Sequence, residues 1–284
     1  MLLIINCLIV TNRKLYKYNI SRKNMDLERI GLGNWAYCLA QARDANKRVS
    51  TGRELIKDRL ERGVNDQTHF GRGGAWATED SNVVDGVILL ARAKFNPLIP
   101  YAEQAVDAQR TGEFHLTDEI VRGKKPFAQV LQNIAEEDAR KPLEKRRVLN
   151  IGQAKTHQVP TDSFVDDPTI RWMAQDPKLA KRYGFFLRNE LPENLRLQEV
   201  TVYLPVIAEK NYSRGHWLDG LGRCGRSGFG CDSRGLDGGD GSVFGVSMSA
   251  EGTPRRVSEP KVRSYTPREA RRYLNVSKKS VCFS

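Results

Sequence analysis

The chain lacks the short signatures that mark common catalytic and metal sites. Its 284 residues contain no His-Glu-x-x-His pair and no Gly-x-Ser-x-Gly turn, and its four histidines stand in separate segments. The five cysteines are odd in number and scattered, so they imply no disulfide framework. The sequence therefore gives no positive sign of catalysis, and we expect a protein that is not an enzyme and holds no cofactor.

One group of polar residues has two interpretations, a chemical site or a solvated loop. His157 is followed by Thr161, Asp162, Asp166 and Asp167, residue types that could supply acid–base groups or carboxylate ligands for a metal. A solvated polar loop has the same composition, and we favour that interpretation.

A second grouping contains the residue types of a zinc site. His216, Cys224 and Cys231 could hold a metal, or the two cysteines could form a disulfide bridge. Six residues separate the cysteines, however, whereas common zinc motifs place their ligands closer together. We therefore expect no metal here.

Long apolar runs are also missing. The ten residues 1–10 are too few to span a bilayer, and their basic neighbours follow the apolar run, the reverse of a secretory signal. Residues 1–24 carry +5 and residues 254–284 carry +7 of the net charge of +12, so the body between them is neutral. A wholly basic nucleic-acid-binding domain has a different charge distribution. We expect residues 1–24 to be a basic extension, with a start at Met25 favoured over a membrane anchor.

The most unusual absence lies between Leu218 and Phe244. These 27 residues contain no Lys, Glu, Gln, Met or Trp, the types that all require a codon ending in a purine under the standard code. Every residue present can be encoded with a pyrimidine in the third position. A segment whose AAC and AAT codons are randomised at the adenines would have this composition.

The same segment is rich in glycine. Eleven of the 31 residues from Gly215 to Gly245 are glycine, a composition that is typical of a flexible linker. A folded, turn-rich surface is the alternative, because glycine permits tight turns and apolar residues recur along the segment. We expect five apolar residues of the region 215–246 to be buried anchors: Trp217, Leu221, Leu236, Val243 and Val246.

The remaining pattern predicts an α+β fold with helices early and strands late. Helical apolar spacing, a Thr51–Glu54 capping box and an early proline predict helices over 26–45, 51–63, 78–91, 101–109 and 126–139. Alternating apolar residues predict strands over 147–151 and 197–207.

A family resemblance adds to this reading. The run from Val200, VTVYLPVIAEKNYSRGHWLDGLG, with the later GLDGGDGSVFGVSMS, resembles variable proteins of diversity-generating retroelements of archaeal or candidate-phylum type. The stretches FNPL at 95–98 and FHLTDE at 114–119 resemble the same group. The resemblance implies a C-type-lectin-like or formylglycine-generating-enzyme-like domain. Together with the helical pattern and the charge distribution, it predicts a division into a helical segment 25–65, a lectin-like domain 66–250 with its variable region at 215–246, and a basic tail 251–284.

The resemblance further implies that the chain binds an unknown protein or surface ligand. Arg and aromatic side chains would supply binding energy, with Ser, Gly and Asp adapting around them. The predicted exposed recognition residues are His216, Leu218, Asp219, Arg223, Arg226, Phe229, Asp232, Ser233, Arg234, Asp237, Asp240 and Phe244.

The basic tail supports an alternative function. Residues 264–281, SYTPREARRYLNVSKKSV, resemble the helix–turn–helix of excisionase-type regulators. On that interpretation the chain is a DNA-binding protein of a mobile element, with phosphate contacts from Arg268, Arg272, Lys278 and Lys279. A basic amphipathic tail helix is the simpler interpretation, and we favour ligand binding without catalysis.

Overall fold

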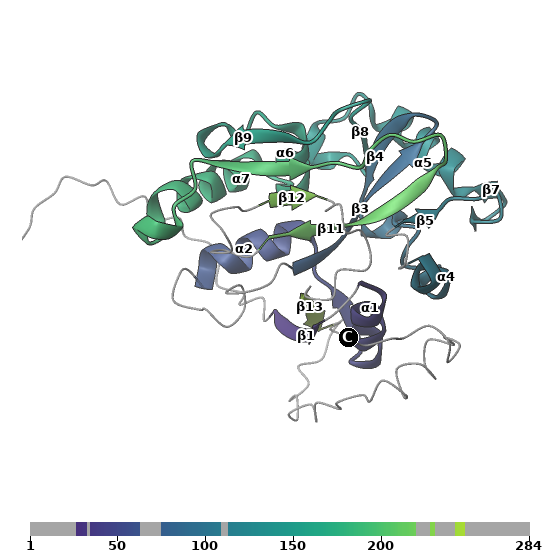
Figure 1. The fold of residues 1–284 in the computed structure, drawn as a ribbon, viewed down its shortest axis with the longest axis horizontal. Helices are drawn as coiled ribbons and strands as arrows, with labels where there is room; N and C mark the ends of the chain where they lie inside the picture. The colour runs from purple at the N-terminus through teal and green to yellow at the C-terminus, as the bar shows by residue number, and fades with distance from the viewer. Residues whose placement is uncertain are drawn as a thin grey trace, which may run out of the picture.

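The computed structural model has an α+β fold (Figure 1). It describes residues 27–32, 35–62, 75–108, 113–219, 228–230 and 242–247. The α-helices are α1 Trp35–Asp44, α2 Gly52–Arg62, α4 Ala102–Asp107, α5 Phe127–Asp138, α6 Pro168–Ala174 and α7 Pro177–Phe185. Short 3-10 or π-helical segments are η2 Ala93–Phe95, η4 Leu143–Lys145, η5 Thr161–Ser163, η6 Phe186–Glu190 and η7 Glu193–Leu195.

Eleven of the described strands form one mixed sheet. Its main path runs β1-β13-β3-β11-β12-β10-β9, with β2 beside β13, β4 beside β3, β8 beside β4 and β5 beside β11. The strands are β1 Glu28–Leu32, β2 Lys47–Val49, β3 Ala75–Val84, β4 Val87–Ala91, β5 Phe114–His115, β8 Val148–Asn150, β9 His157–Pro160, β10 Glu199–Tyr203, β11 Tyr212–Leu218, β12 Gly228–Gly230 and β13 Ser242–Ser247. A separate hairpin pairs β6 Val121–Arg122 with β7 Lys125–Pro126.

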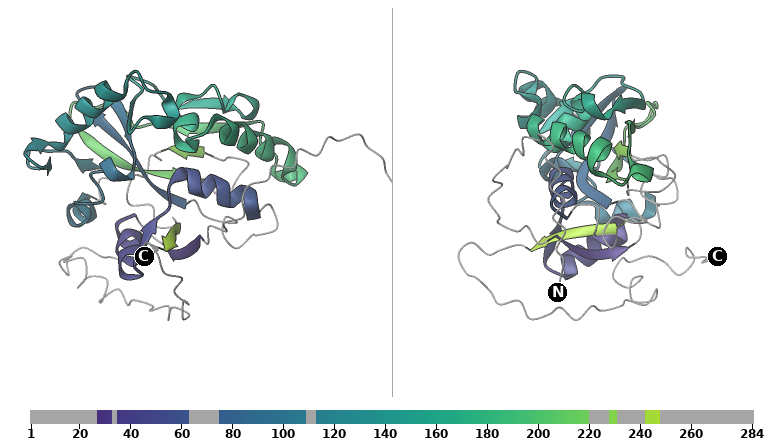
Figure 2. Two further views of the ribbon diagram at one scale, coloured as in Figure 1. Left: turned by 180° about the vertical axis from the view of Figure 1, so that it is seen from behind. Right: turned by 90° about the vertical axis from the view of Figure 1, so that its left-hand side faces the viewer.

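The sheet packs between two hydrophobic cores. One core contains Leu55 of α2, Trp172 of α6 and Ala180 of α7. The other contains Trp35 of α1, Ala105 of α4 and Leu131 of α5. All ten residues of β3 are buried, because the strand has neighbours in the sheet on each side and a core on each face. In the views of Figures 1 and 2, β1, β13 and α1 lie at one end of the molecule, and β9, α6 and α7 lie at the other.

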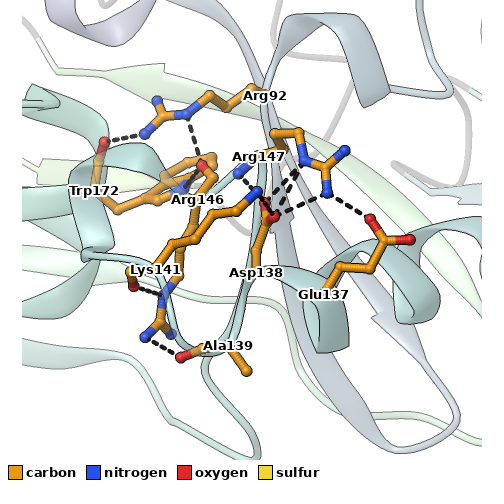
Figure 3. Close-up of polar contacts among 8 residues, drawn as sticks. All are labelled: Arg92, Glu137, Asp138, Ala139, Lys141, Arg146, Arg147 and Trp172. Carbon is orange, nitrogen blue, oxygen red and sulfur yellow. Dashed lines mark hydrogen bonds and ion pairs between the residues drawn. The ribbon is translucent and has the colours of Figure 1, made fainter.

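A charged cluster fastens the end of α5 to β8 (Figure 3). The buried Asp138 carboxylate accepts hydrogen bonds from the backbone and guanidinium of Arg147 and an ion pair from Lys141 at 2.6 Å. Burial alone would raise the pKa of Asp138, but the hydrogen bonds from Arg147 and Lys141 outweigh it and hold that pKa well below its ordinary value. The carboxylate therefore stays charged and paired.

Several sequence predictions are confirmed. Helices α4 and α5 and strands β8 and β10 lie within the predicted ranges. The predicted capping box is present at the start of α2: Glu54 N–H donates to Thr51 Oγ1 at 3.3 Å, and Thr51 N–H donates to the Glu54 carboxylate at 2.9 Å. The α+β class is confirmed as well.

Two helix predictions are wrong. The range 26–45 contains β1 followed by α1, and 78–91 contains no helix but the hairpin of β3 and β4. The two strands turn at Asp85 and Gly86, whose φ angles are +49° and +78°. Asp-Gly favours this kind of two-residue hairpin turn, and the apolar residues around it fit helical spacing only by coincidence. The order is therefore interleaved, with strands before, between and after the first helices.

The predicted division of the chain stays a prediction. In the structure, β1 and β2 both pair with β13, so residues on each side of the proposed boundary at 65 and 66 share one sheet. Residues 1–24 and 251–284 lie outside the described residues. None of the helices in the described part of the chain is long and apolar enough to cross a membrane.

Candidate functional site

Five neighbouring strands each have one terminus on the same side of the sheet. The register places these ends in line, because β1 ends beside the start of β13, β3 begins beside that start, and β11 ends beside the starts of β3 and β12. We call these strand ends the loop edge: Leu32, Ser242, Ala75, Leu218 and Gly228. Residues 220–227 connect β11 to β12, and residues 231–241 connect β12 to β13. The glycine-rich region is therefore attached to the sheet mainly at the loop edge.

Asp219, the last residue before the first glycine-rich connection, accepts hydrogen bonds from two side chains. The guanidinium of Arg59, from α2, donates to the backbone oxygen of Asp219 at 2.8 Å. The indole N–H of Trp217 donates to the Asp219 carboxylate. Arg59 also donates to the hydroxyl of Tyr183 at 2.5 Å, and it is almost completely buried. A buried cation with several acceptors fixes the direction in which the chain leaves β11.

Aromatic packing supports the same anchor. The rings of Trp76 and Trp217 meet edge-to-face with centroids 4.9 Å apart, on neighbouring strands β3 and β11. Such pairs add to the energy of burial. Trp217 is 9% exposed, as expected for an anchor.

Strand β12 interrupts the glycine-rich region with a buried segment. Phe229 is completely buried, and its ring makes edge-to-face contacts with Tyr183 and Phe164 at 5.7 Å and 5.8 Å. Gly230 has a φ angle of +106°, and a Cβ atom there would lie 2.1 Å from the backbone oxygen of Tyr203. Only glycine fits this position, so β12 is a fixed part of the scaffold.

Four of the predicted recognition residues are not exposed. His216, Leu218, Phe229 and Phe244 are all fully buried, so the prediction that they face a ligand at the surface is wrong. Consecutive residues of a strand point to opposite faces, and both faces of this sheet are covered: Trp217 packs in one core, and Leu218 packs in the other. Sequence alternation cannot reveal that both faces are covered.

The other predicted recognition residues divide into two groups. Asp219 is half-buried at the loop edge. The rest lie outside the described residues: Arg223, Arg226, Asp232, Ser233, Arg234, Asp237 and Asp240.

The predicted anchors divide in a similar way. Trp217 and Val243 are buried, which confirms them, and Val246 is half-buried against the first core. Leu221 and Leu236 lie outside the described residues.

A serine and a histidine meet inside the sheet. Ser81 Oγ lies 2.5 Å from His216 Nε2, a pairing that could in other surroundings activate a nucleophile. Both side chains are completely buried, and burial lowers the pKa of His216 to about 3. The imidazole is therefore neutral at physiological pH. The hydrogen bond joins β3 to β11 inside the core.

Two buried acids accompany this pair on β3. Burial raises the pKa of Glu79 and raises that of Asp80 well above its ordinary value. Glu79 accepts a hydrogen bond from the backbone of Gly52 at 2.9 Å, at the start of α2. Asp80 accepts one from Asn82 at 2.9 Å on the opposite face. The two carboxyl groups thus serve separate parts of the core.

Part of the predicted polar loop around His157 is held by defined hydrogen bonds. His157 Nε2 lies 2.7 Å from the Asp167 carboxylate, and Nδ1 lies 2.8 Å from the backbone oxygen of Lys155. Asp167 also caps α6 through Ile170 N–H. Partial burial would lower the pKa of His157, but the hydrogen bonds to Asp167 and Lys155 outweigh it and raise that pKa.

Two other members of this polar group have structural partners. Thr161 donates to the backbone of Gln198, and Asp162 pairs with Arg188. Among the described residues, no three His, Cys, Asp or Glu side chains are placed to hold a metal ion. Cys224 and Cys231 lie outside the described residues, as do the nucleic-acid candidates Arg268, Arg272, Lys278 and Lys279.

Sequence reasoning missed Arg59 and Tyr183. A signal for Arg59 was available: it lies four residues after the buried Leu55 and so occupies the apolar stripe of α2. A charged residue on such a stripe must have a polar partner in the core. No local pattern identifies the partner, because Asp219 is 160 residues away.

Comparison with known proteins supports the architecture. A solved structure of a C-type lectin fold that accommodates massive sequence variation in Nanoarchaeota is similar, with a TM-score of 0.57 and 11% sequence identity. The similarity covers 79% of this chain and 99% of that one. No protein-family model and no curated protein matches the chain. At this identity the similarity shows the fold alone, and the chain has a C-type lectin fold.

Proposed function

We propose that this protein binds a ligand without catalysing a reaction, through the glycine-rich region 215–246 attached at the loop edge. We further propose that a retroelement diversifies this region.

The proposal rests on one observation: the glycine-rich connections begin and end at strand residues that are fixed in the core. Trp217, Phe229 and Val243 are buried, and Arg59 holds the backbone at Asp219. Connections fastened in this way can change sequence while the core stays the same. The similar solved structure accommodates massive sequence variation on the same fold, which supports this division of labour here.

The composition of the connections fits a binding surface. They contain Arg, Asp and Ser, which supply charge and adaptable hydrogen bonding. Since Phe229 and Phe244 belong to the core, the binding energy would come mainly from Arg223, Arg226 and Arg234.

A display library tests the binding role. The seven candidates outside the described residues would be randomised together: Arg223, Arg226, Asp232, Ser233, Arg234, Asp237 and Asp240. We expect most members to keep the parent's thermal transition, and selection against streptavidin, as an arbitrary target, to yield binders. A matched library at Leu218, Phe229, Val243 and Phe244 should mostly fail to fold. Equal loss of folding in both libraries, or no binder from the first, contradicts the proposal.

The neighbouring DNA tests diversification separately. We expect a reverse-transcriptase gene nearby and a near-copy of the codons for residues 215–248 that differs only at adenines. Differences spread over all four bases would contradict diversification by a retroelement, while leaving the binding role to be decided by the library.

A further inference from the structure

The β6–β7 hairpin carries a concentration of positive charge. Arg122 and Lys125 are cross-strand partners, and Lys124 lies in the turn after Gly123, whose φ angle is +68°. Residues 120–135 contain no Asp or Glu. Lys124 and Lys125 are exposed. Figure 1 shows β7 at the far end of the molecule from α7, in a short ribbon that projects from the body.

The hairpin is fixed firmly at its base. The Tyr101 hydroxyl donates to the backbone oxygen of Val121 at 2.6 Å and accepts from its N–H at 3.0 Å. Arg122 donates to the backbone oxygen of Lys94 at 2.5 Å, and its guanidinium lies 4.7 Å from the centre of the Phe95 ring. The backbone of the hairpin and the side chain of Arg122 are therefore held in place before any partner arrives, which reduces the entropy lost on binding.

The cations around the hairpin have no carboxylate partner among the described residues. In the part of the chain that the structure describes, Lys94, Arg122, Lys124 and Lys125 form no ion pair with a carboxylate, and the nearby exposed Asp118 and Glu119 form none with them. Like charges directly opposite each other on paired strands destabilise a hairpin. By contrast, the neighbouring Arg147 and Lys141 are both paired with Asp138 (Figure 3).

We propose that the β6–β7 hairpin and Lys94 form a contact surface for the phosphate backbone of duplex nucleic acid. A two-stranded ribbon is a shape that a duplex groove admits, and duplex DNA presents a dense row of negative charge. An anionic membrane fits less well, because Val121 is the one exposed large apolar side chain on the hairpin, and interfacial segments bury several.

This contact is independent of the ligand-binding function and of the basic tail. It would hold the protein near nucleic acid through phosphates, without reading base sequence. Arg122 and Phe95 fix the ribbon, and Lys94, Lys124 and Lys125 reach the phosphates.

The test compares two pairs of exposed lysines in the full chain. Binding of a fluorescent random-sequence duplex DNA would be measured by anisotropy over a range of KCl concentrations. The hairpin variant carries Lys124→Gln and Lys125→Gln, and the matched control carries Lys178→Gln and Lys181→Gln on α7. Both variants lose the same charge and keep the basic ends, so a difference between them reports position.

We expect the hairpin variant to bind roughly tenfold more weakly at low salt, with a salt dependence shallower by about 2, as for two lost phosphate contacts. The control should stay within about twofold of the parent. Equal weakening of both variants, or no weakening of the hairpin variant, overturns the proposal. The proposal is also overturned if the hairpin lysines contribute to the binding of vesicles made of phosphatidylcholine and phosphatidylserine in equal parts but do not contribute to the binding of duplex DNA.

Discussion

Arg59 of helix α2 donates a hydrogen bond to the backbone oxygen of Asp219, 160 residues later in the chain. The same guanidinium donates to Tyr183, whose ring packs against Phe229 of β12. One buried side chain thus connects the end of β11, the core helix α7 and the strand inside the glycine-rich region. The loop edge therefore depends on a residue far outside that region.

The first prediction concerns this connection. Arg59→Met should lower the free energy of unfolding by roughly 2–3 kcal/mol, because two hydrogen bonds to a charged group are lost. Hydrogen exchange should show the largest loss of amide protection at residues 217–219 and 229. Lys57→Met, on the same helix, serves as the control and should change stability by less than about 0.5 kcal/mol. Equal effects of the two substitutions would contradict the assigned role of Arg59.

The second prediction concerns the buried Asp80. Its pKa is raised in the folded state, so the protonated form stabilises the fold fully below the ordinary pKa of about 3.9. That contribution is lost as the pH rises through the folded-state pKa. Asp80→Asn keeps an acceptor for Asn82 and does not titrate.

We therefore expect Asp80→Asn to gain roughly 1–3 kcal/mol of stability at neutral pH, with the gain vanishing near pH 3. Urea unfolding at several pH values measures both quantities. Asp118→Asn, which removes an exposed carboxylate, is the control. If the difference in stability between Asp80→Asn and the parent does not change with pH, the pKa of Asp80 is not raised in the folded protein.

The third prediction concerns His157, whose two ring nitrogens both face acceptors. Because both can donate only in the imidazolium form, the pKa is raised, and this stabilisation is complete below the unfolded pKa of about 6.5. It is lost as the pH rises through the folded-state pKa. The side chain is 40% exposed, so solvent screening should keep the effect under about 1 kcal/mol.

NMR titration of the imidazole protons should give a midpoint above that of a histidine in an unfolded peptide. Asp167→Asn should lower the midpoint while retaining a cap for α6. A midpoint that is unchanged by this substitution would show that the carboxylate does not hold the imidazolium.

The sequence revealed those elements whose signals are local. The α2 capping box and the amphipathic pattern of α5 depend on residues within a few positions of one another, and both were predicted correctly. The pairing of β3 with β11 joins residues that are more than 120 positions apart, so no local pattern contains it. Apolar spacing favoured a helix over 78–91, but β3 and β4 pair there through the turn at Asp85 and Gly86.

The candidate site was predictable only in part for the same reason. Glycine content and missing residue types pointed to the region 215–246, and the buried Trp217 and Val243 could be recognised as anchors. Leu218, Phe229 and Phe244 were assigned to the surface because an exposed apolar residue and a buried one look alike in a glycine-rich run. The distinction requires the packing partners, such as Tyr183 and Phe164 around Phe229.

The last prediction separates scaffold glycines from tolerant ones. Gly230 and Gly86 both have positive φ angles, +106° and +78°, so an alanine at either position is strained. A Cβ atom at Gly230 would lie 2.1 Å from the Tyr203 backbone oxygen, whereas nothing lies within 4 Å of one at Gly86. Gly86→Ala should therefore cost about 1 kcal/mol from backbone strain alone, and Gly230→Ala should cost more than about 3 kcal/mol because β10 or β12 must move.

Thermal unfolding of the two variants measures the difference. If the glycine-rich region is diversified, its natural variants must also keep glycine at position 230 while other positions change. GGN codons contain no adenine in their first two bases, so adenine-directed mutagenesis would leave such a glycine intact. Gly230→Ala as mild as Gly86→Ala would show that β12 is free to shift, and the fixed attachment of the glycine-rich region would then lose its physical basis.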